Sequence, residues 1–170
     1  MPGILAMIAI KRILVATDFS EASEQALDYG RTVAQQFNAS LHVVHVVENL
    51  AMKTILADGF LSVLPELQRD LEAAARTRLD ALIARLAAEG VRSEGHVVTS
   101  TATAEAIVTY AQEESVDLIV IGTHGLGGMS RFLLGSVAER VVRTARCPVL
   151  TIRVPDRDLP RKDRPAEASA

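Results

Sequence analysis

The chain has 170 residues, of which 49% are hydrophobic and 23% are charged, a balance typical of a single soluble globular domain. Its net charge of −3 argues against the basic face that neutralises nucleic-acid phosphates, and an aromatic content of 4% argues against a base-stacking platform. We therefore expect no nucleic-acid partner. The single cysteine, Cys147, cannot form an intrachain disulfide, which fits a reducing cytoplasm.

The two ends of the chain differ in composition from its middle. Residues 1–10 are apolar, but no basic residue precedes them, and they fall short of the roughly 20 apolar residues that span a bilayer. We expect no signal peptide and no membrane span; Met1 and Met7 both remain candidate starts. The prolines and alternating charges near the other end predict a disordered tail. The expected organisation is an extension at 1–7, one domain at 8–154 and a tail at 155–170.

Strand and helix patterns alternate through the first half of this domain. The sequence predicts strands at Lys11–Thr17 and Leu41–Val47, with a helix capped by Ser20 between them. The apolar face of that helix is expected at Ala22, Ala26, Tyr29, Val33 and Phe37. Residues 48–64 show no clear period and predict a mobile connection. A long helix follows, ended by Gly90 and with its buried face at Leu67, Leu71, Ala75, Leu79, Leu82 and Leu86.

The second half continues the alternation. It predicts strands at Val91–Thr99, Asp117–Thr123 and Pro148–Val154. One intervening helix buries Ala104, Ile107, Val108 and Ala111, and the other spans Val137–Ala145. Strict alternation of strands and helices predicts an α/β fold with a parallel sheet covered by helices on both faces, because parallel crossovers are right-handed. We therefore expect one doubly wound domain.

A glycine-rich segment joins the fourth predicted strand to the last helix. It runs from Gly122 through Gly125 and Gly128 to Gly135 and Ser136. Glycine lets an anion approach the main chain closely, and the N–H groups and positive dipole at a helix start attract phosphate. The spacing matches neither the nucleoside-triphosphate loop nor the dinucleotide fingerprint. The segment is also longer than a plain strand-to-helix connection, which favours a function for it.

This glycine pattern resembles the phosphate-binding signature of the ATP-binding branch of the universal stress protein family. Three further segments are similar to that family: 13–21 to its first strand and acidic contact, 41–48 to its second strand, and 145–153 to its last strand. The resemblance implies a five-stranded sheet of order 3-2-1-4-5, whose first and fourth strands end side by side. Ligands bind at such a switch point.

The resemblance also implies a ligand and the residues that bind it. The ligand would be ATP or another adenine nucleotide, with Mg²⁺ held at the phosphates with help from Asp18. The implied nucleotide-binding residues are Ala16, Thr17, Asp18, Val46, Gly122, Gly125, Gly135, Ser136 and Val137. His124 and Arg131 are candidate phosphate contacts.

Each assignment has a plainer alternative. Asp18 and Ser136 are also placed to cap helices, Val46 suits a buried strand, and Arg131 suits a solvated loop. His42 and His45 are expected on opposite faces of one strand, so they cannot share a metal, and we interpret both as structural. No metal cluster or catalytic residue is evident, and Cys147 has no neighbouring base in sequence.

Two functions follow from these observations. The favoured one is a cytoplasmic stress-response or signalling module in which bound nucleotide controls conformation, dimerisation or partner binding. The resemblance implies a homodimer through the last strand, which would pair an otherwise open edge. The alternative is a nucleotide hydrolase or phosphoryl- or adenylyl-transfer enzyme of the same superfamily, which needs a positioned base or nucleophile that the sequence does not reveal.

Overall fold

The computed structural model describes residues 9–50, 64–123 and 134–153, which form one doubly wound α/β domain. Its strands are β1 (Arg12–Ala16), β2 (Ser40–Glu48), β3 (Ser93–Ser100), β4 (Leu118–Gly122) and β5 (Val149–Ile152), and its helices are α1 (Glu21–Phe37), α3 (Leu64–Ala88), α4 (Thr103–Glu113) and α5 (Ser136–Thr144). All strand pairs are parallel, in the predicted order β3-β2-β1-β4-β5. Three predicted segments fall wholly or largely outside the described residues: the connection within 48–64, the extension 1–7 and the tail 155–170.

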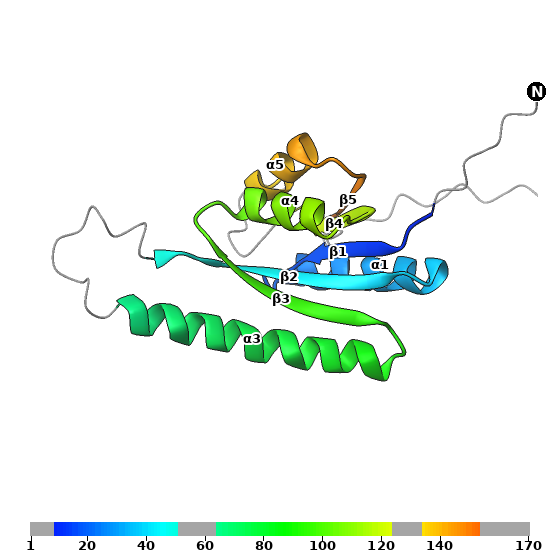
Figure 1. Ribbon diagram of the computed structural model, residues 1–170. Helices are drawn as coiled ribbons and strands as arrows, with labels where there is room; N and C mark the ends of the chain where they lie inside the picture. The colour runs from blue at the N-terminus through cyan, green and yellow to red at the C-terminus, as the bar shows by residue number, and fades with distance from the viewer. Residues whose placement is uncertain (1–8, 51–63, 124–133, 154–170) are drawn as a thin grey trace, which may run out of the picture.

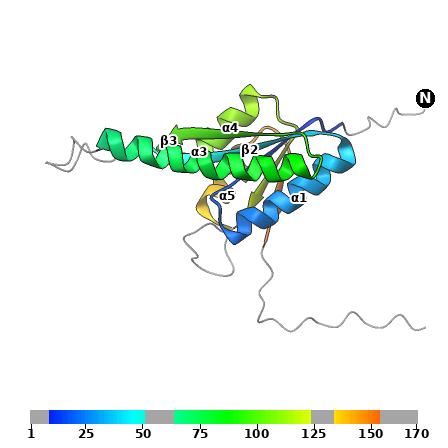
Figure 2. The same ribbon diagram turned by 90° about the horizontal axis from the view of Figure 1, so that it is seen from below.

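Helices cover both faces of this sheet, as the alternation predicted. Figures 1 and 2 show α4 and α5 on one face and α1 and α3 on the other. The central strand β1 is buried on both sides because its successive side chains alternate between the faces. Ile13 and Val15 belong to the core under α1 and α3, and Leu14 and Ala16 belong to the core under α4 and α5.

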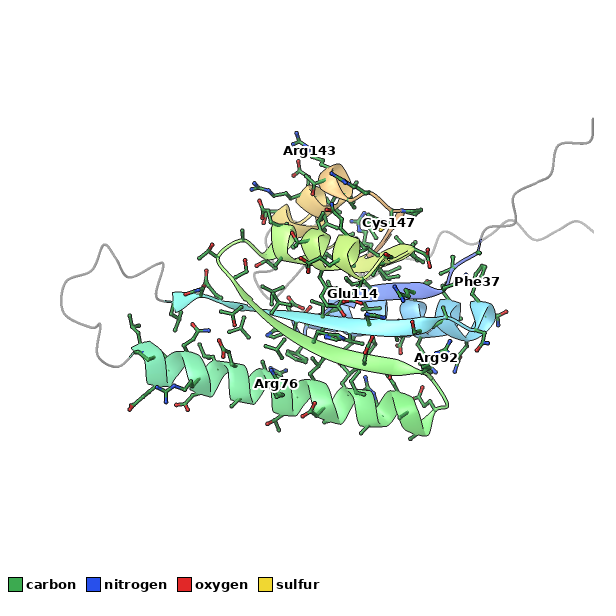
Figure 3. All side chains as sticks on the ribbon, viewed as in Figure 1. Phe37, Arg76, Arg92, Glu114, Arg143 and Cys147 are labelled. Carbon is green, nitrogen blue, oxygen red and sulfur yellow. The ribbon has the colours of Figure 1, made fainter. Side chains whose placement is uncertain are left out.

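Helix α1 begins as predicted but buries a different stripe. Ser20 is its N-cap and accepts a hydrogen bond from the backbone N–H of Ser23. The predicted burial of Tyr29 and Phe37 is wrong, since their exposed fractions are 56% and 47%; Figure 3 labels Phe37 at the end of α1. Small residues bring the helix close to the sheet, so the buried stripe is rotated away from the large rings toward Leu27, Gly30 and Ala34.

Helix α3 is buried only along its later turns. The prediction is correct for Ala75, Leu79, Leu82 and Leu86, all of which are buried. It is wrong for Leu67 and Leu71, whose exposed fractions are 49% and 41%. The periodic apolar positions extend toward the start of the helix, beyond the part of it that packs on the core. Gly90 follows the helix with φ +76°, the left-handed conformation expected after a helix C-terminus.

Within the described residues, no helix is both long enough and apolar enough to cross a membrane.

Candidate functional site

The winding of the chain reverses between β1 and β4. Ala16, the last residue of β1, pairs with Val44 of β2 on one side and Ile121 of β4 on the other. The chain leaves β1 through α1 toward β2 and leaves β4 through α5 toward β5, in opposite directions across the sheet. Ligands of open α/β sheets bind outside the carboxyl ends of strands at such a point. The structure therefore brings the segments after β1 and β4 together, as the sequence predicted.

The turn after β1 holds an acidic side chain at this switch point. Thr17 is buried; its backbone N–H donates to the carbonyl oxygen of Val44 over 2.9 Å. Asp18 follows, and its Oδ1 accepts hydrogen bonds from the backbone N–H of Ser20, at 3.0 Å, and from the Ser20 hydroxyl. Ser20 itself caps α1, so Asp18 supports the cap rather than being it. The turn fixes a carboxylate at the carboxyl end of β1.

A histidine of β2 steadies the same turn from the neighbouring strand. Nδ1 of His45 lies 2.8 Å from the carbonyl oxygen of Thr17, and its ring lies 4.6 Å from that of Phe19. His42 instead contacts Tyr110 of α4, so the two histidines occupy opposite faces as expected. Val46 packs with Ala16 in the core under α4 and α5, which is the plainer role considered for Val46.

Phe19 and Arg78 are neighbours of this turn that the sequence did not indicate. Phe19 has φ +60°, an unusual backbone conformation for a large side chain. The guanidinium carbon of Arg78, from α3, lies 4.1 Å from the centre of the Phe19 ring, an arrangement favourable for cation–π attraction. A positive charge is thus placed beside the residue that follows Asp18. No sequence spacing signals this contact, because it joins separate elements across the fold.

Gly122 ends β4 where the strand meets the first turn of α1. A Cβ at this position would lie 2.9 Å from the carbonyl oxygen of Ala22. Packing against backbone therefore requires glycine here, whether or not phosphate binds nearby. The next residue, Thr123, donates its N–H to the Ile152 carbonyl over 2.8 Å.

The two ends of the glycine-rich segment meet. The backbone N–H of Gly135 donates to the carbonyl oxygen of Thr123 over 2.7 Å. The chain therefore leaves β4 and returns to α5 at one point beside the switch point. The predicted residues His124, Gly125 and Arg131 lie outside the described residues.

Helix α5 begins with a glycine at its N-cap. The N-cap is Gly135, and Ser136 is the first residue inside the helix, so the expectation that Ser136 could cap it is wrong. Because glycine has no side chain, the N-cap itself offers no oxygen to the first N–H groups of the helix, at Ser136 and Val137. Gly135 has φ −58°, which any residue adopts, so backbone conformation does not demand glycine there. A missing Cβ would still ease the approach of an anion to these N–H groups.

Several titratable groups with displaced pKa values lie away from the switch point. Burial lowers the pKa of His42, with Glu94 opposing that shift, and burial raises the pKa of Tyr110. Burial also raises the pKa of Cys147, which Figure 3 shows in the turn between α5 and β5. Thiols with raised pKa are poor nucleophiles at neutral pH, in line with the expectation that Cys147 packs rather than reacts.

The structure is that of a doubly wound α/β protein whose switch point carries a carboxylate, Asp18, after β1 and the glycine-capped N-terminus of α5 after β4. The model of the Universal stress protein family matches residues 9–153, and the chain belongs to that family.

Known relatives span nearly the same length. A universal stress protein of Methanocaldococcus jannaschii, MJ0531, is 33% identical over 149 residues, covering 87% of this chain and 85% of the relative. The structure of MJ0577 from the same organism superimposes with a TM-score of 0.76 at 28% identity, covering 88% of this chain and 99% of that one.

Two of the similar structures hold nucleotides. A universal stress protein in complex with cAMP has a TM-score of 0.63 at 27% identity, covering 85% of this chain and 98% of that one. One from Archaeoglobus fulgidus in complex with dAMP has a TM-score of 0.56 at 25% identity, covering 86% and 99%.

Proposed function

We propose that this universal stress protein binds ATP or a related adenine nucleotide at the crevice between β1 and β4, and that the nucleotide regulates its conformation, dimerisation or partner binding. The observation that carries the proposal is the N-terminus of α5, which lies beside the switch point and whose N-cap, Gly135, has no side chain of its own. Phosphate oxygens would accept hydrogen bonds from the N–H groups that a cap otherwise satisfies. The cAMP and dAMP complexes of similar proteins support an adenine nucleotide as the ligand.

The residues around the crevice fit the parts of a nucleotide. Asp18 would accept a hydrogen bond from a ribose hydroxyl or help to hold a phosphate-bound Mg²⁺, and Ala16, Thr17 and Val46 would border the base. Gly122, Gly125, Gly135, Ser136 and Val137 would line the phosphates, together with His124 and Arg131. Arg78 adds a cation close to the turn that holds Asp18.

The proposed role is binding and not catalysis. Cleavage at a phosphate needs a positioned base or nucleophile and strong cationic stabilisation of the developing charge. In the described part of this region, the Asp18 carboxylate accepts hydrogen bonds from Ser20, and Nδ1 of His45 lies 2.8 Å from the carbonyl oxygen of Thr17. Both side chains therefore have structural partners in the turn, and His42 and Cys147 lie away from it. We therefore propose a signalling module of the cytoplasm with the domain at 8–154.

A homodimer through β5 is the proposed assembly. β5 pairs with β4 alone among the described strands, so one edge of its backbone is available for pairing with a second copy. Light scattering with and without ATP would give the assembly state and show whether nucleotide changes it. A monomer under both conditions would contradict the dimer.

A melting experiment on nucleotide-free protein tests the ligand. At about 100 times Kd, ATP with Mg²⁺ should stabilise the fold by about 2.7 kcal/mol, which raises Tm by about 5–10 °C for a domain of this size. ADP, AMP and cAMP provide the comparison, and isothermal titration calorimetry gives Kd directly. No shift and no heat with any of these nucleotides would overturn the proposal.

A pair of matched variants tests the placement at Asp18. Asp18→Asn keeps an oxygen that can accept from Ser20 while removing the charge, and should reduce the nucleotide-induced shift. Asp28→Asn, at an exposed position of α1, should leave it unchanged. Equal shifts in the two variants would show that Asp18 does not contact the nucleotide.

A further inference from the structure

A second cluster of polar side chains lies at the other end of the sheet. His42 is near the start of β2 and pairs in register with Glu94, near the start of β3. His96 lies two residues beyond Glu94, so both point to the same face of β3. The proposed nucleotide site lies at the carboxyl ends of the strands, whereas these residues lie at the amino ends of β2 and β3. The cluster is therefore separate from the proposed nucleotide site.

Both histidines present Nε2 to the same carboxylate. His42 Nε2 lies 3.0 Å from Glu94 Oε1, and His96 Nε2 lies 3.7 Å from Glu94 Oε2. The second distance is too long for a hydrogen bond. Among the residues that the structure describes, the buried Nε2 of His96 has no hydrogen-bond partner. Buried polar atoms are nearly always paired, so an unpaired imidazole nitrogen next to a carboxylate requires an explanation.

The spacing of these atoms matches a metal site. One ligand atom from each of His42, Glu94 and His96 lies within 4.8 Å of the others. A tetrahedral Zn²⁺ bound at about 2.0–2.2 Å holds neighbouring donor atoms about 3.3–3.6 Å apart. His42 Nε2 lies 3.0 Å from one oxygen of Glu94 and His96 Nε2 lies 3.7 Å from the other, so small side-chain movements would bring both nitrogens and one of these oxygens around an ion.

The surroundings of His42 also suit a ligand. Its side chain is 4% exposed, and its Nδ1 lies 2.9 Å from the hydroxyl oxygen of Tyr110 on α4. Metal-bound histidines usually donate their other ring N–H to such a partner, which fixes the tautomer and the ring orientation. Tyr110 would accept that hydrogen bond and direct Nε2 of His42 toward Glu94. The Glu94 and His96 side chains are 55% and 35% exposed, which leaves a path for the ion from solvent.

We propose that His42, Glu94 and His96 form a binding site for Zn²⁺, with water in the fourth position. Two imidazole nitrogens and one carboxylate oxygen are a donor set that zinc accepts, and Co²⁺, Ni²⁺ and Cu²⁺ also bind such ligands. The ion would join the edge strand β3 to β2 at the end of the sheet opposite the nucleotide.

Titration of the chelator-treated, full-length protein with Zn²⁺ tests this site. Isothermal titration calorimetry should give one Zn²⁺ per chain, and Co²⁺ should produce the visible absorption of a four-coordinate site. Glu94→Gln and His96→Ala each remove one ligand at a partly exposed position and should weaken Zn²⁺ binding at least tenfold. Circular dichroism establishes that both variants are folded.

Three control variants test whether Zn²⁺ binding is specific to this site. Glu89→Gln changes an exposed carboxylate, His45→Gln changes a histidine on the opposite face, and Cys147→Ser removes the thiol; all three should bind Zn²⁺ as the parent does. Absence of one-to-one binding, or equal affinity in folded Glu94→Gln, His96→Ala and parent proteins, would overturn the site. The titration contains no nucleotide, so its outcome is independent of the proposed function.

Discussion

Gly30 of α1 lies directly over Val15 of β1, so closely that a Cβ on Gly30 would stand 2.4 Å from Cγ2 of Val15. Val15 is fully buried and β-branched, so it has little freedom to move aside. Gly30→Ala gains about 1 kcal/mol of helix propensity but overpacks the core, which costs about 1–3 kcal/mol. We expect a net loss of stability in urea unfolding.

A double-mutant cycle isolates this contact. Val15→Ala alone should destabilise the protein by leaving a cavity. In the double variant the methyl group introduced by Gly30→Ala enters the space that Val15→Ala vacates, so the total loss should be smaller than the sum of the single losses. Strict additivity of the two changes would show that the methyl group finds room elsewhere.

The Ser20 cap supplies the second prediction. Its hydroxyl accepts from the Ser23 N–H and donates to Asp18, so Ser20→Ala should lower the free energy of unfolding by about 1 kcal/mol. Ser20→Asn retains a capping oxygen and should cost less. Thermal unfolding of the three proteins measures the difference, and equal losses in the two variants would argue against a capping role.

The third prediction separates a phosphate site from an ordinary helix start. Gly135→Ser puts a capping hydroxyl at the N-cap of α5. This should raise the stability of the nucleotide-free protein by only a few tenths of a kcal/mol. The same hydroxyl competes for the N–H groups that would bind phosphate, so the nucleotide-induced rise in Tm should shrink.

Ser136→Ala provides the comparison for that variant. Ser136 lies inside the helix and is not its cap, so loss of its hydroxyl should reduce nucleotide binding less than Gly135→Ser does. A folded Gly135→Ser protein with the Kd of the parent would place the phosphates away from the start of α5.

The fourth prediction concerns turnover. In the described residues at the switch point, Asp18 accepts hydrogen bonds from Ser20 and Nδ1 of His45 lies 2.8 Å from the Thr17 carbonyl oxygen, so both side chains are held by the turn. Steady-state ATP hydrolysis should therefore be far slower than about 1 s⁻¹, the lower end of typical enzyme rates. Phosphate release from highly purified protein measures it. A rate in the enzymatic range that a single substitution abolishes would favour a hydrolase instead.

The fifth prediction concerns the thiol of Cys147, whose pKa burial raises. In the folded protein the thiolate forms at higher pH than in the unfolded chain, so alkylation of the native protein should be slower at pH 8 and should accelerate at higher pH. A chain unfolded in urea is the reference. Equal alkylation rates for the native and the unfolded chain would show that the thiol is freely accessible and that its pKa is not raised in the folded protein.

The same pKa has a consequence for stability. Because the folded state retains the proton longer, the contribution of Cys147 to stability is fully present below the unfolded pKa of about 8.5 and is lost as pH rises through the folded pKa. Cys147→Ser should lack this decline when urea unfolding is compared between neutral and alkaline pH.

The sequence was sufficient for the order of the elements and for the sheet. Apolar strands separated by helical periods dictate a covered parallel sheet, and Ser20 and Gly90 mark helix ends through local hydrogen bonding and backbone conformation. The errors arose where burial depends on the neighbouring element. Tyr29 and Leu67 satisfy the helical period of their own segments, but the core does not extend to either side chain.

Contacts between distant segments were beyond the reach of sequence periodicity. The placement of His96 beside His42 depends on the register of β2 and β3, and that of Arg78 over Phe19 depends on how α3 crosses the sheet. The predicted meeting of the segments after β1 and β4 succeeded because strand order alone determines it. The helix cap at Gly135 was missed because Ser136 offers the more usual capping side chain.

The hydrogen bond between Thr123 and Gly135 joins the end of β4 to the start of α5. Residues inserted between these two positions would be anchored at both ends. A flexible insert that doubled the length of chain between them would add only about 0.6 kcal/mol of closure entropy, at the expense of the phosphate contacts proposed there.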